Sequence, residues 1–146
     1  MPRIERTARV EWEGSVARGE GRIDGESGAF SGVPFSLPSR IGDPDGKTSP
    51  EELLAAATAG CFTMSLGSEL ARDSTPPARL EVHCKIVMDE VAGEGHQIVG
   101  AELTVDAEIE GSSGEALAAA LERAEAGCPF TTLLRKAGAT VSVSQS

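Results

Sequence analysis

An uncharged run over residues 53–66, directly behind a strong helix start, constrains the fold of this chain more than any other feature. Ser49 suits the N-cap, Pro50 suits the first helical position, and Glu52 completes a capping box with Ser49. We therefore predict a helix from Pro50 to about Ala71. A helix that is apolar on nearly every side must be buried, so the rest of the chain has to cover it.

The remaining sequence predicts short strands and two further helices around this central helix. Apolar residues alternate with polar ones in the predicted strands, and glycines separate the segments. In chain order, the predicted elements are strands and turns over residues 7–37, a hairpin over 79–110, a helix over 115–126, a helix over 129–137 and a strand over 140–143. Elements segregated in this way are typical of an α+β fold, and 146 residues suit a single domain over residues 1–146.

The charge and hydropathy of the chain limit the classes of partner that we expect it to bind. The formal net charge is -10 and the isoelectric point is about 4.6. Nucleic acids and cytoplasmic membrane surfaces are anionic, so we expect neither as a partner. No stretch approaches the roughly 20 apolar residues that cross a bilayer, and the first residues lack the apolar run of a secretory signal. We therefore expect no membrane association and a cytoplasmic location.

The three cysteines are the residues most suited to chemical reactivity. In the cytoplasm thiols are held reduced, so a disulfide that forms here should be transient and either catalytic or sensory. Cys61 lies within the uncharged run and fits either a buried small side chain or a functional thiol. Cys128 lies between Gly127, a natural helix C-cap, and Pro129, a natural helix start. Its thiol is either an idle turn residue or a thiolate stabilised by the N-terminus of the following helix. Cys84 falls on the inward face of a predicted strand, where core packing explains it.

No pattern typical of a metal or nucleotide site occurs in the sequence. His83, His96 and the cysteines are scattered, without the CxxC or HExxH spacing of zinc sites. The GxSxG, Walker and dinucleotide-binding motifs are also absent. We therefore expect no metal and no cofactor. Helix capping explains Glu51 and Glu52 before any acid–base role does.

Two cysteine-containing stretches carry a family resemblance. The stretch TSPEELLAAATAGCF runs from Thr48 to Phe62, and the stretch AEAGCP runs from Ala124 to Pro129. In this order they resemble the two cysteine motifs of the OsmC/Ohr family, the osmotically inducible and organic-hydroperoxide-resistance proteins. The N-terminal part of the chain is more similar to the OsmC branch than to the Ohr branch.

The resemblance implies both a fold and a function. The fold is OsmC-like, with antiparallel sheets wrapped around long central helices in an intertwined homodimer. The implied activity is that of a thiol-dependent peroxidase, in which Cys61 attacks an organic hydroperoxide or hydrogen peroxide and then forms a disulfide with Cys128. Arg40 and Glu51 occupy the places of the arginine that assists the attacking thiol and of its carboxylate partner. An external dithiol, for which a lipoyl protein is suited, would reduce the disulfide.

The resemblance and the local sequence disagree about the attacking thiol. The helix-dipole argument favours Cys128 as the thiol of low pKa, whereas the resemblance assigns the attack to Cys61. We follow the resemblance, because Arg40 would stabilise a Cys61 thiolate directly.

The spacing of Glu51 and Cys61 bears on the oligomeric state. They are ten residues apart, about 15 Å along a straight helix, so one arginine can hardly reach both within one chain. An antiparallel pair of central helices would bring Glu51 of one chain near Cys61 of the other. The sequence therefore favours a homodimer.

Apolar residues near the two cysteines predict the walls of a substrate pocket. These residues are Leu54, Phe62, Met64, Phe130 and Leu133. Such walls would admit organic hydroperoxides as well as hydrogen peroxide. Phe130 and Thr131 depart from the family pattern of a small aliphatic residue and a serine, which should alter the pocket wall rather than the chemistry. Two other functions stay open: a thiol-based redox sensor, and a non-catalytic binding member of the same fold.

Overall fold

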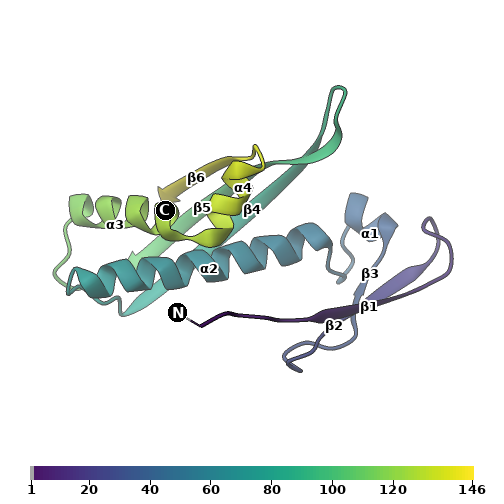
Figure 1. The fold of residues 1–146 in the computed structure, drawn as a ribbon, viewed down its shortest axis with the longest axis horizontal. Coiled ribbons are helices and arrows are strands. Elements are labelled where there is room, and N and C mark those ends of the chain that lie inside the picture. The colour runs from purple at the N-terminus through teal and green to yellow at the C-terminus, as the bar shows by residue number, and fades with distance from the viewer. Residues whose placement is uncertain (1) are drawn as a thin grey trace. The chain divides into compact units, whose positions relative to one another are not determined.

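The computed structural model describes residues 2–146, which form two compact units. Unit 1 comprises Met1–Pro50 and unit 2 comprises Glu51–Ser146. Figure 1 shows the elements of both units in chain order. The α+β class predicted from the sequence is confirmed, while the single domain over residues 1–146 stays a prediction.

Unit 1 is a three-stranded antiparallel sheet followed by a short helix. The strands β1 (Ala8–Glu13), β2 (Glu20–Gly25) and β3 (Val33–Phe35) lie in the order β1-β2-β3. Helix α1 (Leu37–Ile41) follows, and the Ser36 hydroxyl caps it by accepting the Ser39 N–H. The sequence predicts strands and turns up to residue 37 but does not predict α1, which has only five residues.

A glycine lets two aromatic rings meet on the unit 1 sheet. Gly21 pairs with Trp12 on one side and with Phe35 on the other. A Cβ atom at Gly21 would lie 2.3 Å from the Phe35 ring and 2.7 Å from the Trp12 ring. Without that atom, the two ring centroids approach to 5.5 Å in a tilted arrangement. Trp12 is therefore a packing residue of this small sheet.

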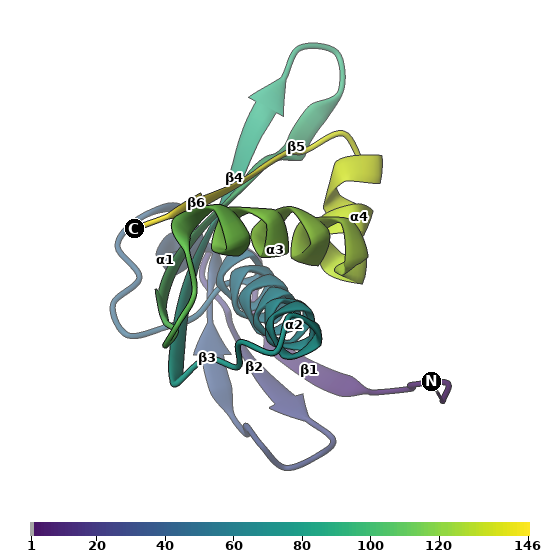
Figure 2. The same ribbon diagram turned by 90° about the vertical axis from the view of Figure 1, so that its left-hand side faces the viewer.

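Unit 2 packs three helices on a second sheet. Helix α2 (Pro50–Arg72) is followed by the strands β4 (Arg79–Val91) and β5 (Gly95–Glu108), which form the predicted hairpin. Helices α3 (Gly114–Gly127) and α4 (Pro129–Lys136) come next, and β6 (Thr140–Gln145) pairs in parallel with β5. Figures 1 and 2 show α2 and α3 side by side on one face of the sheet.

The core of unit 2 is the seam between these helices and β5. It is built from buried apolar side chains of α2, β5 and α3, among them Phe62, Leu66, Leu70, Leu103, Val105 and Leu121. Cys128 belongs to the same buried cluster, and Cys61 packs against it. The predicted central helix is therefore confirmed, with its end at Arg72 close to the expected Ala71.

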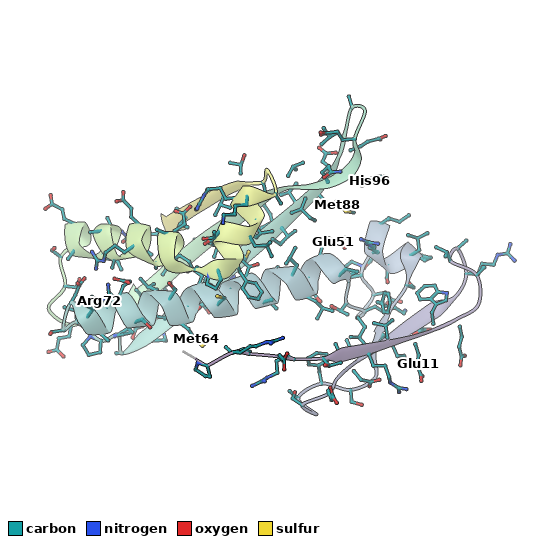
Figure 3. The ribbon with its side chains drawn as sticks, viewed as in Figure 1. Glu11, Glu51, Met64, Arg72, Met88 and His96 are labelled. Carbon is teal, nitrogen blue, oxygen red and sulfur yellow. The ribbon has the colours of Figure 1, made fainter. Side chains whose placement is uncertain are left out.

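Within unit 2, one face of α2 is covered. The buried residues are spaced at helical intervals: Thr58, Phe62, Leu66 and Leu70. On other faces the exposed residues are mostly small: Ala56, Ala57, Gly60, Met64, Ser68 and Ala71. Met64 is 71% exposed and projects from α2 on the side away from the unit 2 sheet (Figure 3). We refer to these six exposed residues as the open face of α2.

By length and mean hydropathy, α2 would suffice to cross a bilayer. The expectation that no stretch approaches this size is therefore wrong for α2, because the uncharged run continues into a long helix. This is weak support for a membrane span, since the core helix of a soluble protein meets the same criteria. Helix α2 packs one face against β5 and α3, so the expectation that it is buried on nearly every side is wrong for its remaining faces.

Candidate active site

Folding brings Cys61 and Cys128 into direct contact. Cys61 lies in the middle of α2, and Cys128 lies 67 residues later at the joint between α3 and α4. Their Sγ atoms are 3.3 Å apart, with the Cys128 thiol donating to the Cys61 sulfur. A disulfide bond is about 2.05 Å long, so small side-chain motions would let the two sulfurs bond. The sulfur positions are therefore compatible with disulfide formation.

The joint that carries Cys128 is shorter than the sequence predicts. Gly127 was expected to end the helix as its C-cap, but Gly127 is the last residue of α3 and Cys128 is the cap. Cys128 is also the N-cap of α4, with an extended φ of -80° and no capping bond from its side chain. One residue thus separates the two helices, which fixes the direction of the Cys128 side chain.

Two further sets of contacts stabilise this joint between α3 and α4. The buried Thr131 hydroxyl lies 2.8 Å from the Glu125 carbonyl and 3.1 Å from the Cys128 carbonyl. Arg135 of α4 pairs with the Glu125 carboxylate of α3. From the sequence, Thr131 is only a departure from the family pattern in the pocket wall. Its position two residues behind a helix-starting proline was the signal that it could bond back to the preceding helix end.

The two thiols differ in their access to solvent. Cys128 is 0% exposed, whereas Cys61 is partly exposed. Cys61 is therefore the more accessible of the two residues to a small molecule from solvent. The roles of attacking and resolving thiol that the family resemblance implies stay predictions.

The N-terminus of α4 acts on the Cys61 thiol. Burial raises the pKa of the Cys61 thiol, and the hydrogen-bonded Cys128 thiol raises it further. The backbone N–H of Phe130, in the first turn of α4, acts in the opposite direction and lowers the pKa of Cys61. The first turn of α4 thus acts on the Cys61 thiol, an effect that the sequence does not reveal because it depends on how α4 packs against α2.

Arg40 and Glu51 belong to different units. Arg40 lies in the last turn of α1 in unit 1, beside a cavity of about 230 Å³ that Trp12, Phe35 and Leu37 also line. Glu51 lies in the first turn of α2, at the beginning of unit 2 (Figure 3). Within unit 2 the structure brings together Cys61 and Cys128, while Glu51 stands ten residues before Cys61 on the same helix.

The predicted pocket walls are only partly available to a ligand. Phe62 is fully buried in the core of unit 2, so its assignment to a pocket wall is wrong. Met64 is exposed but belongs to the open face of α2, and Leu54 is half-buried. Phe130 and Leu133 of α4 remain as apolar side chains that reach the surface, 37% and 62% exposed.

The other cysteine has no comparable surroundings. Cys84 lies on β4, packs against the core and is not in contact with a second cysteine among those described. Burial raises the pKa of its thiol. Among residues 2–146, no group of three or more His, Cys, Asp or Glu side chains could hold a metal ion.

Comparisons with known proteins bear on both fold and chemistry. The family described as OsmC-like protein matches residues 42–144. Peroxiredoxin OsmC of Escherichia coli (strain K12) is 30% identical over 132 residues, which cover 90% of this chain and 91% of that protein. Peroxiredoxin OsmC of Shigella flexneri gives the same values.

Two solved structures show the same fold at lower identity. An OsmC-like protein of unknown function from Vibrio cholerae superposes with a TM-score of 0.79 at 15% identity, covering 99% of this chain and 100% of its own. The organic hydroperoxide resistance protein OhrB of Bacillus subtilis superposes with a TM-score of 0.75 at 22% identity, covering 96% and 98%. At such identities the likeness establishes the fold alone.

The difference in exposure predicts an order of thiol labelling. Brief treatment of the reduced protein with N-ethylmaleimide should modify Cys61 about tenfold faster than Cys128, because the reagent must reach the sulfur. Mass spectrometry of peptides measures the two rates. Denatured protein is the control, in which the rates should become similar. Equal rates in the folded protein would contradict the order of access described above.

Proposed function

The chain belongs to the OsmC-like family, and on this premise we propose that it is a thiol-dependent peroxidase that reduces organic hydroperoxides and hydrogen peroxide. The observation that carries the proposal is the 3.3 Å contact between a partly exposed Cys61 and a buried Cys128. The names of two relatives support the same chemistry, since both are peroxiredoxins.

Cys61 is the nucleophile of the proposed reaction. Its thiolate attacks one peroxide oxygen, the O–O bond breaks, and the other oxygen leaves as an alcohol or as water once it is protonated. Cys61 is thereby oxidised to a sulfenic acid, and the peroxide takes up the two electrons. The Phe130 N–H supports the thiolate from the N-terminus of α4.

Cys128 is the resolving thiol. Its sulfur attacks the Cys61 sulfenic acid, a disulfide forms, and the hydroxyl leaves as water. The contact between the sulfurs makes this step short in distance and favours it over further oxidation of Cys61. An external dithiol then returns both cysteines to thiols by exchange and becomes a disulfide itself. A lipoyl protein in a reducing cytoplasm fits this role.

A cation near Cys61 is needed to complete the site. Burial and the neighbouring thiol raise the pKa of Cys61, which leaves little thiolate at neutral pH without further help. We assign this task to Arg40, oriented by an ion pair with Glu51. The guanidinium would also stabilise the negative charge that develops on the departing oxygen.

A homodimer supplies the arginine in this proposal. Glu51 lies about 15 Å along α2 from Cys61, so an arginine held by Glu51 would serve Cys61 of a second chain. The open face of α2 supports such a pairing, because small side chains allow two helices to approach closely and because a chain of this size would otherwise leave Met64 71% exposed.

Apolar side chains at the surface indicate the substrate class. Phe130 hydrogen-bonds through its backbone to Cys61, and Leu133 lies three residues later, near it on the same helix. Both side chains reach solvent. They would contact the carbon chain of an organic hydroperoxide, which hydrogen peroxide lacks, so we expect organic hydroperoxides to react faster.

The proposed function predicts sustained peroxide consumption. Reduced protein with excess dithiothreitol should consume many equivalents of cumene hydroperoxide, as followed by the loss of peroxide. Cys61→Ser should abolish turnover. Cys128→Ser should react and then lose activity as Cys61 over-oxidises. Cys84→Ser is the matched control and should retain the wild-type rate.

Other outcomes of this experiment select other functions. Consumption of no more than one equivalent per chain would replace the peroxidase with a thiol-based sensor. No consumption at all would leave a non-catalytic member of the same fold. Either result would overturn the proposed turnover.

Mixed dimers test the assignment of Arg40. A dimer of one Arg40→Gln chain with one Cys61→Ser chain should keep about half of the wild-type activity, because the intact Cys61 faces the intact Arg40. A dimer of a wild-type chain with a chain carrying both substitutions should be nearly inactive. Affinity-tagged pairs separated after refolding allow both rates to be measured. The reverse pattern would show that Arg40 serves Cys61 of its own chain.

A further inference from the structure

A hydrogen bond between α2 and α3 lies one helical turn away from the two sulfurs. The Ser65 hydroxyl of α2 donates to the Ala124 carbonyl of α3 at 2.8 Å. Ser65 follows Cys61 by four residues, and Ala124 precedes Cys128 by four residues. Residues four apart lie on the same side of a helix. The hydrogen bond and the sulfur contact are therefore neighbouring contacts between the same two segments.

The position of Ala124 gives this bond a function in the helix as well. The last four carbonyls of a helix lack partners inside it, and Ala124 is the fourth residue from the end of α3. Ser65 supplies a partner for Ala124, as Thr131 does for Glu125. The helix end that leads directly into Cys128 is therefore tied to the helix that carries Cys61.

The neighbouring hydroxyls of α2 show that this tie is particular to Ser65. Thr58 donates to the Leu54 carbonyl and Thr63 donates to the Ala59 carbonyl, so both bonds stay within α2. The Ser65 bond spans 59 residues of sequence. Gly127 lies beside this bond, where a Cβ atom would be in ordinary contact with the Ser65 hydroxyl at 3.7 Å.

We propose that Ser65 is a positioning residue for disulfide formation: its bond to Ala124 sets the register of α2 against α3 that holds the Cys128 sulfur against Cys61. The inference rests on the proposed function. Ser65 acts on the second step, in which Cys128 attacks the Cys61 sulfenic acid and water leaves. It does not act on the first step, because the attack on peroxide uses Cys61 and the Phe130 N–H of α4.

The test separates the two steps in the intact protein. One equivalent of cumene hydroperoxide is mixed with reduced protein, and quenched samples are analysed by mass spectrometry for the Cys61–Cys128 disulfide. Ser65→Ala should slow disulfide closure about five- to tenfold, since lost hydrogen bonds and small displacements of reacting groups have effects of this order. It should raise the over-oxidised fraction of Cys61 accordingly.

Two controls make the result specific. Thr63→Val removes a hydroxyl that bonds only within α2, and it should leave closure unchanged. The rate of peroxide attack, measured in a Cys128→Ser background, should be the same within about twofold with and without Ser65→Ala, since that step does not need the tie. Unchanged closure in Ser65→Ala would overturn the inference. A parallel fall of attack and closure would overturn it as well, because Ser65 would then only maintain the fold.

A second oxidant distinguishes failure of this inference from failure of the proposed function. Diamide takes two electrons from a pair of adjacent thiols and leaves as the hydrazine, so it closes the disulfide without a sulfenic acid. If wild type forms the disulfide with diamide but not with the hydroperoxide, the peroxidase proposal fails. The effect of Ser65→Ala is then measured as the rate at which diamide closes the disulfide. A slower rate than in wild type would support the inference, and an unchanged rate would overturn it.

Discussion

The contact between the Cys61 and Cys128 sulfurs is the interaction on which the rest of this structure depends. It requires an uncharged helix that can pass through a core, and it requires two helices joined by a single residue at the edge of that core. Burial of the pair has a cost, because it raises the pKa of Cys61. The Phe130 N–H offsets part of that effect from within unit 2, and we assign the remainder to Arg40.

Sequence reasoning was most successful where local chemistry decides the structure. The capping signals at Ser49-Pro50 and the uncharged run behind them predicted α2, and strict alternation predicted the hairpin of β4 and β5. It failed where the local structure depends on a single helical turn or on a tertiary contact. Helix α1 is too short for periodicity to reveal, and Gly127 is helical because α4 begins after only one intervening residue.

The features of the candidate site also divide into those that local sequence predicts and those that depend on tertiary contacts. Cys61 and Cys128 were recognisable from motifs, but their 3.3 Å separation was not, since it depends on how α2 packs on α3. Phe62 was assigned to a pocket wall because apolar side chains look alike in sequence, and only the fold shows that it is buried. The roles of Ser65 and Thr131 were missed because each depends on the backbone carbonyl that the hydroxyl contacts in the folded chain, and the sequence does not show that contact.

The central claim is that the Cys61 sulfur takes the oxygen from peroxide. The most direct measurement treats Cys128→Ser protein with one equivalent of cumene hydroperoxide in the presence of dimedone, which captures sulfenic acids, and maps the adduct by mass spectrometry. This account predicts a dimedone adduct on Cys61, with Cys84 unmodified. An adduct on Cys84, or capture at Cys128 in a Cys61→Ser protein at the same rate, would contradict it.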